Sequence, residues 1–417
     1  MAGTSQRFHF TVTDFPDGAK SFVELPFQVD QDAERIEASY FVADKDGGPK
    51  SVIDLGMAHE GVSRGWTGSE YNQISISEDA ASPGYIAGQL AGKWKLVLGI
   101  VHLTEGCKID VTVDVIKKRR QWLSGDLHSH TEHSDGGVSV SEAVSRARHT
   151  GLDFVALTDH NTTAQNHVLL DKPGILVIPG MELTTYFGHT NFLGVRMPVK
   201  NWQCATPEQV EERMHEAKAN GATIILNHFM DPGGFNRWVC GFQVPHDAVE
   251  IWNGHWSARN VSALQRWQEM LCEGVRIPAT AGTDFHLKNK RRHGYPCNRL
   301  FADGRSVSGL LKAVREGRNV ISAAPNGLIC EPVSPDAPNF GDVIPVGSRI
   351  AIKFEGLSNA DEIRIVTEKG VVEALRAENT VQQMETVLNG RFVRFEVWQV
   401  KDGDFAPKLF TNPIFAE

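Results

Sequence analysis

Two closely spaced histidines give the first indication of chemistry in this sequence. His128 and His130 stand one residue apart after an apolar run, and Asp135 follows in the same segment. Side chains two positions apart in an extended segment project from the same face, so both imidazoles can reach one metal ion. Imidazole nitrogens suit zinc, iron and manganese, and a carboxylate can bridge two cations. The segment therefore predicts a metal site.

Further candidate ligands follow apolar runs later in the chain. A lone histidine is more often an ordinary polar group than a ligand, but nine candidates near the ends of predicted strands favour a shared cluster. Six histidines and three carboxylates suit two or three divalent ions, with zinc, manganese and iron as the candidates. The nine predicted ligands are His128, His130, Asp135, His160, Glu182, His189, His228, Asp284 and His286.

The segments that must position these ligands alternate between apolar strands and amphipathic helices. Strands that look buried on both faces are expected near 154–157, 175–178, 223–226, 248–251 and 277–281. Helix boundaries are marked by a capping box at Ser139 and Glu142, by proline after Thr206, and by Gly151, Gly221 and Gly274. In a parallel barrel the carboxyl ends of the strands meet on one face, where catalytic residues collect. Residues 120–325 are therefore predicted to form an α/β barrel.

The two flanking segments have a different pattern. Short runs of alternating polarity separated by turns occupy 1–119 and 326–417, as is typical of small β-sandwich-like domains. A chain of 417 residues is too long for one ordinary core. The sequence thus predicts a multidomain protein with an N-terminal β domain (1–119), a central barrel (120–325) and a C-terminal β domain (326–417).

Composition restricts the partners. A formal net charge of -9 argues against a general nucleic-acid binder, which needs basic surface to neutralise phosphates. The first residues lack the apolar core of a secretory signal, and no stretch approaches the length of a membrane span. Six scattered cysteines without a C-x-x-C pair indicate reduced thiols. We expect a cytoplasmic protein with a small-molecule substrate, and the sequence leaves its oligomeric state open.

The metal-ligand motifs resemble those of the PHP (polymerase and histidinol phosphatase) superfamily. The set H-x-H-x-x-x-x-D, T-D-H-N, G-M-E, N-H and G-T-D-x-H occurs in that family's order over about 200 of the residues. The resemblance implies a distorted (β/α)7 barrel with a di- or trinuclear site. It also implies one metal on His128, His130, Glu182 and Asp284, a second on Asp135, His160 and His286, and a third on His189 and His228 with Glu182 bridging.

Other segments resemble the branch of this superfamily named after carbaryl hydrolase. Ile53-Asp-Leu-Gly, Arg64-Gly-Trp-Thr-Gly-Ser and Gly92-Lys-Trp-Lys in the N-terminal segment carry this likeness, as does Glu250-Ile-Trp-Asn253. Members of the branch are associated with both phosphoester and carboxyl or carbamate ester chemistry. The resemblance therefore implies a metallohydrolase and leaves the ester class open.

Residues around the ligands are candidates for catalysis and substrate binding. Asp159 is a candidate proton carrier or partner of a metal-bound histidine, with a structural role at the strand end as the alternative, and His286 is the second catalytic candidate. The basic run 288–293 could attract an anionic substrate through Arg291 and Arg292, or could be a solvated surface loop. Asn253 is a candidate substrate contact, and Trp252, Trp256 and Phe229 could contact a ring of the substrate.

Three functions remain open on the sequence alone. The first is a phosphoesterase acting on a small anionic ester through metal-activated water. The second is a carboxyl or carbamate ester hydrolase that uses the same metals. The third is a non-catalytic, metal-stabilised binding module, although such a module would be expected to lose ligands. The basic run favours the phosphoesterase.

Overall fold

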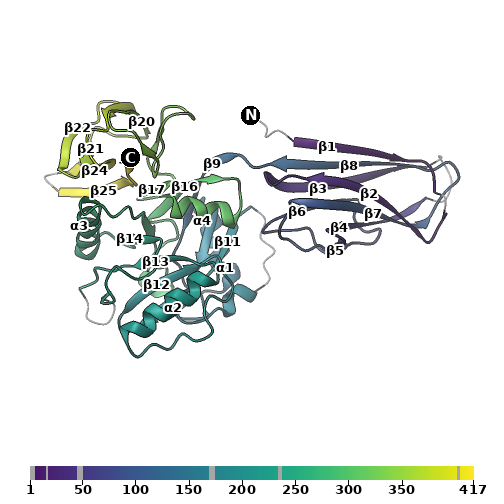
Figure 1. Ribbon diagram of the computed structural model, residues 1–417, viewed down its shortest axis with the longest axis horizontal. Coiled ribbons are helices and arrows are strands. Elements are labelled where there is room, and N and C mark those ends of the chain that lie inside the picture. Colours follow the sequence, from purple (N-terminus) through teal and green to yellow (C-terminus); the bar gives the residue numbers. More distant parts are fainter. Residues whose placement is uncertain (1–4, 16, 45–49, 169–173, 233–236, 402–403) are drawn as a thin grey trace. The chain divides into compact units, whose positions relative to one another are not determined.

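The computed structural model describes residues 5–15, 17–44, 50–168, 174–232, 237–401 and 404–417, and their packing divides the chain into two units (Figure 1). The N-terminal unit contains residues 1–120 with 303–306, and the main unit contains 121–302 and 307–417. All nine predicted ligands lie in the main unit.

The N-terminal unit consists of two four-stranded antiparallel sheets. Polarity alternates along its strands: in β7, Trp94, Leu96 and Leu98 are buried, whereas Lys93 and Lys95 are exposed. The apolar faces share one core, as expected for a β sandwich. One sheet contains β1 (Ser5–Val12), β8 (Lys108–Lys117), β3 (Ala33–Ala43) and β6 (Gln73–Ser77). The other contains β2 (Ser21–Val29), β7 (Gly92–His102), β4 (Val52–His59) and β5 (Val62–Trp66).

Seven consecutive strands form the sheet of the α/β part. Their order is β9 (Arg120–Asp126), β10 (Phe154–Leu157), β11 (Leu176–Thr185), β12 (Gly188–Leu193), β13 (Thr223–Asn227), β14 (Ala248–Asn253) and β15 (Ala279–Gly282). Beyond the ends of β9 and β15, the Asp284 N–H donates to the His128 carbonyl (2.8 Å), and the His130 N–H donates to the Phe285 carbonyl (3.3 Å). The segments that follow β9 and β15 are thus bonded to each other, and this brings the first and last strand ends together.

The capping residues that the sequence indicated mark both ends of α1 and α2 and the end of α3. Ser139 caps α1 by accepting from the Glu142 N–H, and Thr206 caps α2 with proline in its first turn. Gly151, Gly221 and Gly274 each follow a helix with φ near +90°, a conformation that glycine adopts without strain. The helices are α1 (Val140–His149), α2 (Pro207–Ala219), α3 (Ala258–Cys272) and α4 (Val307–Arg315), with 3-10 turns η1 (Ala164–His167) and η2 (Leu287–Asn289).

The alternation of strands and helices departs from a regular (β/α)7 repeat. The described residues contain four α-helices, and β11 and β12 pair antiparallel. Only Tyr186 and Phe187 connect these two strands, which is enough for a hairpin but far too short for a helical crossover. β12 then pairs antiparallel with β13, whereas β13, β14 and β15 are parallel.

The C-terminal residues extend the same sheet and add a second one. The sheet continues through β16 (Cys297–Asp303), β17 (Asn319–Ser322), β25 (Asp404–Thr411), β24 (Phe392–Lys401), β21 (Asp361–Thr367) and β22 (Gly370–Arg376). The second sheet contains β18 (Ile329–Pro332), β20 (Arg349–Glu355) and β23 (Val381–Val387), while β19 (Val343–Ile344) pairs with β26 (Ile414–Ala416). Because β17 pairs with β25, backbone hydrogen bonds join this β region to the α/β part. A separate domain at 326–417 stays a prediction.

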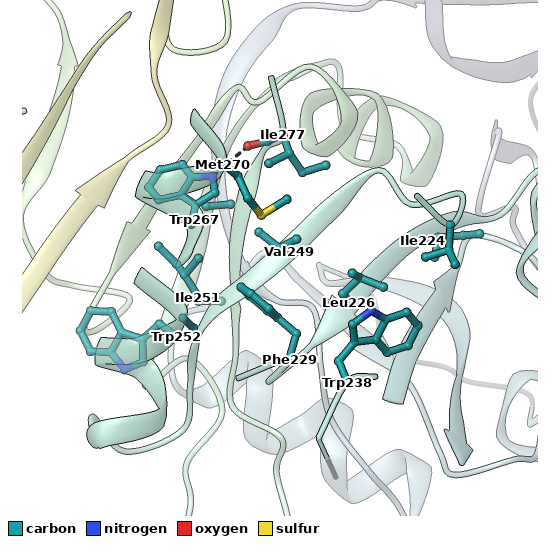
Figure 2. Packing of buried hydrophobic residues seen from close by; sticks show 14 of the residues in the cluster. Ile224, Leu226, Phe229, Trp238, Val249, Ile251, Trp252, Trp267, Met270 and Ile277 are labelled. Carbon is teal, nitrogen blue, oxygen red and sulfur yellow. Dashed lines mark hydrogen bonds between the residues drawn. The ribbon is translucent and has the colours of Figure 1, made fainter. Parts of the chain in front are cut away.

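The largest core of the main unit packs α3 against the strands that carry the ligands. Trp267 and Met270 of α3 share one cluster with Val249 and Ile251 of β14 (Figure 2). The buried Trp267 indole donates its N–H to the carbonyl of Ile277 at 2.9 Å. The cluster therefore holds β14 and the segment before β15 in place below the site.

We expect Trp267→Phe to lower the free energy of unfolding of the main unit by about 1–3 kcal/mol, because it leaves a cavity and an unpaired buried carbonyl. Urea denaturation followed by circular dichroism measures this loss. Trp202→Phe is the matched control, since Trp202 is 46% exposed, and it should shift the transition by less than about 0.5 kcal/mol. Equal stability of the two variants would contradict the packing described here.

Candidate metal centre

The nine predicted ligands lie together, most of them just beyond the carboxyl ends of strands. His128 and His130 follow β9, His160 follows β10 and His228 follows β13. Glu182 lies within β11, and His189 lies near the amino end of the antiparallel β12 in the same hairpin. Asp284 and His286 follow β15, and Asp135 lies in the loop after His130. They form three groups whose ligand atoms lie within 4.8 Å of one another. The groups are His128, His130 and Asp284; His130, Asp135, His160 and His286; and Glu182, His189 and His228.

Glu182 is at the middle of this cluster. Its fully buried carboxylate lies within 3.5 Å of nitrogens from five imidazoles. Burial alone would raise the pKa of Glu182, but His128, His160 and His189 outweigh it and hold that pKa well below its usual range. The five distances are 2.8 Å to His160, 3.2 Å to His189, 3.4 Å to His128, 3.4 Å to His130 and 3.5 Å to His228.

Two aspartates complete the cluster. Asp284 Oδ1 lies 3.1 Å from His130 Nε2 and 3.6 Å from His128 Nε2. Asp135 Oδ1 lies 2.7 Å from His286 Nε2 and 3.5 Å from His160 Nε2. Burial would raise the pKa of Asp284, but His128, His130 and Arg291 hold it well below its usual range. Both ends of the cluster therefore present an ionised carboxylate to imidazole nitrogens.

Unpaired buried atoms show that the cluster fits cations. His128 Nε2, His130 Nε2 and Glu182 Oε2 are buried, and within the described part of the chain none of their close contacts has the geometry of a hydrogen bond. A buried polar atom without a partner is costly, and a metal ion is a partner that imidazole and carboxylate lone pairs both suit. The donor set therefore fits divalent transition metals.

Glu250, within β14, orients two of the candidate ligands. Its Oε1 lies 3.0 Å from His128 Nδ1, and its Oε2 accepts from the His228 N–H (2.9 Å) and the Asn253 amide (2.8 Å). Burial would lower the pKa of His128, but Glu182, Glu250 and Asp284 raise it well above its usual value. Sequence reasoning singled out the Glu250–Asn253 run without assigning this role to Glu250.

Asp159 anchors the loop that carries Asp135. It is fully buried, and its oxygens accept from the Thr131 N–H (2.8 Å), the Thr131 hydroxyl (2.8 Å) and the Ser134 hydroxyl (2.7 Å). Gly136 allows the loop to turn back, because a Cβ there would lie 2.2 Å from the His130 carbonyl carbon. These contacts favour the structural alternative for Asp159 over a proton carrier.

The backbone is strained where the ligands leave their strands. His228 and Asp284 have φ of 27° and 48°, and Asn161, next to His160, has 52°. Such conformations cost about 1–3 kcal/mol each in non-glycine residues and persist where surrounding contacts enforce them. Asp126 supplies such contacts, because its Oδ1 accepts from the N–H groups of His128 and Thr283. The strained backbone lowers the stability of the fold but directs these side chains towards the cluster.

A cavity of about 580 Å³ opens onto the cluster, and its walls carry two cationic side chains besides the candidate ligands Asp135 and Asp284. Arg259 and Lys288 line it together with His160, His189, His228 and His286. Lys288 pairs with Asp135 at 3.0 Å, and Arg259 pairs with Asp231 at 3.0 Å. Sequence reasoning noted Lys288 within the basic run and missed Arg259, for which no local pattern gave a signal.

The three predicted substrate contacts are engaged by the protein itself. Asn253 is fully buried between Glu250 and Arg259. Arg291 pairs with Asp284 Oδ2 at 2.7 Å and donates to two backbone carbonyls, so it braces a candidate metal ligand. Arg292 lies over the ring of Tyr295. Within the described residues, none of the three lines the cavity, and their contact with substrate stays a prediction.

Comparison with known proteins identifies the central segment. Residues 126–230 match the family model described as the PHP domain. A 5'-3' exoribonuclease of Haemophilus influenzae is 40% identical over 63 residues, which cover 14% of this chain and 23% of that protein. The chain thus spans less than a quarter of that relative's length. In the described part of the chain, no helix has the length and apolar character needed to cross a membrane.

Two solved structures show a weaker likeness. A two-domain protein from Bacteroides vulgatus, described as containing a predicted PHP-like metal-dependent phosphoesterase, is 19% identical with a TM-score of 0.40. The match covers 71% of this chain and 96% of that chain. A proposed metal-dependent phosphoesterase from Bifidobacterium adolescentis is 17% identical with a TM-score of 0.31, over 45% of this chain and 95% of its own.

We expect metal-replete protein to contain two or three metal ions per chain. If the wild type holds three ions, Glu182→Ala should lose at least two of them. Five imidazoles face this carboxylate, whereas His228 belongs to one group, so His228→Ala should lose no more than one ion. Elemental analysis measures the metal content of the wild type and of the two variants. His215→Ala, at an exposed position on α2, is the control. Full metal content in Glu182→Ala would refute this arrangement.

Glu250→Gln tests the orienting layer separately from the ligands. The amide keeps the shape of the side chain but loses the charge that holds His128, so we expect metal affinity to fall about 10- to 100-fold. Competition against a chelating indicator gives the affinity. Glu269→Gln, on the exposed face of α3, should leave the affinity unchanged. An unchanged affinity in Glu250→Gln would assign Glu250 to packing alone.

Proposed function

We propose that this chain, whose residues 126–230 match the PHP domain, is a PHP superfamily metal-dependent hydrolase that cleaves small phosphate esters. One observation carries the proposal: a buried carboxylate is ringed by five imidazoles, and three of them line a cavity whose walls also carry Arg259 and Lys288. Ligands suited to transition metals thus occur beside cations suited to an anionic substrate.

The three residue groups would hold the metals, with Glu182 and His130 placed to serve more than one ion. Divalent cations bound there supply Lewis acidity and make water nucleophilic near neutral pH. The chain's own contribution is orientation. Glu250 contacts the His128 ring, and Arg291 pairs with Asp284. Asp126 accepts hydrogen bonds from the backbone N–H groups of His128 and Thr283.

His286 is placed to act at the mouth of the cluster. Its Nδ1 donates to the backbone carbonyl of Asp284 at 2.9 Å, which leaves Nε2 as the atom that faces Asp135. This atom is the one available to a metal or to a proton from substrate. Asp159, with its oxygens engaged by Thr131 and Ser134, positions the Asp135 loop.

Two cations favour a phosphoester over a neutral ester. Lys288 and Arg259 reach the cavity from different elements, after β15 and on α3, and can attract the charged oxygens of a phosphate. A carboxyl or carbamate ester would use much less of this charge, so hydrolysis of such esters at the same site is the second candidate. The intact set of ligands disfavours a non-catalytic binding module.

A substrate panel tests the proposal. We expect phosphate monoesters or small diesters to be cleaved with manganese, zinc or iron. Single-stranded RNA, included in the same panel, should be cleaved far less, because the net negative charge of the chain disfavours binding of the RNA backbone. Lys288→Met should lower kcat/KM for phosphoesters about fivefold, the effect of ~1 kcal/mol for an exposed charge, and leave aryl esters within about twofold. Lys290→Met is the control, because Lys290 does not line the cavity.

Fast aryl-ester hydrolysis without phosphate release would replace the phosphoesterase by the second candidate. Preferential cleavage of RNA would instead move the substrate class towards that of the exoribonuclease relative. Turnover of neither esters nor RNA by metal-loaded protein would refute the hydrolase.

A further inference from the structure

A second cavity continues from the one over the ligand cluster. It measures about 780 Å³ and shares Tyr186, Trp202 and Cys204 with the first. Gln209 and Arg213 of α2 line its far side. The shared residues form the wall between the two spaces, so a molecule longer than a phosphate group can extend from the ligand cluster past Tyr186 and Trp202.

Tyr186 projects from a tightly fixed turn. It is 81% exposed, although the turn between β11 and β12 that carries it is anchored on both sides. The Phe187 N–H donates to the Thr185 hydroxyl (3.0 Å), and the Val239 N–H donates to the Phe187 carbonyl (3.0 Å). The same hairpin carries Glu182 and His189, so the position of Tyr186 is coupled to that of the candidate ligands.

Trp202 is exposed on the facing loop. Nearly half of its surface is accessible, and the loop is fastened by hydrogen bonds from the Gln203 N–H to Asn201 Oδ1 (3.0 Å) and from the Ala205 N–H to Gln209 Oε1 (2.7 Å). Among the described residues, no aromatic ring or cation stacks on Trp202 or Tyr186. Two rings on anchored segments are thus left open at one cavity wall.

The aromatic residues that the sequence offered for ring binding serve a different purpose. Phe229 is buried, and Trp252 is buried in edge-to-face contact with Trp256 at 5.1 Å. These three side chains are part of the apolar packing of the main unit. Any ring contact at the mouth of the site therefore falls to Tyr186 and Trp202.

We propose that Tyr186 and Trp202 form a subsite for a flat aromatic ring in the substrate, next to the ester group at the ligand cluster. This inference rests on the proposed function and narrows the substrate class to phosphoesters that carry a planar ring, either a simple aryl group or a nucleobase. Stacking on an exposed aromatic side chain needs no base-specific hydrogen bonds and tolerates both kinds of ring.

The test compares ring and non-ring ligands of equal charge. In metal-replete protein, calorimetry gives the Kd of phenylphosphonate against methylphosphonate, and of adenosine monophosphate against ribose phosphate. We expect the wild type to prefer each ring ligand. Trp202→Leu combined with Tyr186→Leu should weaken ring ligands about tenfold and leave the non-ring ligands within about twofold. Trp66→Leu is the matched control, because Trp66 is also an exposed tryptophan and lines neither cavity.

The outcomes separate this inference from the proposed function. Loss of ring preference in the double variant, with no phosphoester turnover by any form, would keep the subsite and refute the phosphoesterase. Phosphoester turnover by a wild type without ring preference, or equal weakening of ring and non-ring ligands in the double variant, would overturn the subsite. If only phenylphosphonate binds better than its non-ring partner, the substrate is an aryl ester. If adenosine monophosphate binds better than ribose phosphate, the substrate is a nucleotide.

Discussion

A carboxylate buried away from water must be surrounded by positive charge or by hydrogen-bond donors, and Glu182 is the residue on which this constraint acts most strongly. Taking an ionised group out of water costs several kcal/mol unless its partners are close and well placed. The five imidazoles around Glu182 come from segments associated with β9, β10, β12 and β13. The carboxyl ends of β9, β10 and β13 must therefore converge with the amino end of the antiparallel β12, and the hydrogen bonds beyond β9 and β15 complete that convergence.

The remainder of the site keeps this arrangement rigid. Asp126, Asp159 and Glu250 each hold backbone or side chains near the ligands, and they do so from buried positions. The positive φ angles of His228 and Asp284 show that local preference is overridden there. The apolar packing of α3 against β14 provides the stability that such strain requires. A preorganised ligand set is useful because it need not reorganise when charge develops during a reaction.

Charge and aromatic surface at the mouth of the site are divided between different elements. Arg291 is committed to Asp284, whereas Lys288 and Arg259 reach the cavity. Tyr186 and Trp202 present open rings on fixed turns, while Trp252 and Phe229 are buried in the core. Arg291 therefore supports a candidate ligand away from the cavity, whereas Lys288, Arg259, Tyr186 and Trp202 line it, with Lys288 and Arg259 also paired to Asp135 and Asp231.

The sequence by itself determined the candidate ligands, the helix caps and the buried strands, because these depend on residue type and short spacing. Ser139, Thr206 and the glycines after the helices act within one turn, and His128 with His130 act within one extended segment. Only the tertiary structure decided the roles of Asp159, Asn253 and Arg291, and which cations and rings face the cavity. These roles depend on partners far away in the sequence, such as Asp284 for Arg291 and Thr131 for Asp159. Local spacing carries no information about such contacts, because they form only when separate strands pack side by side.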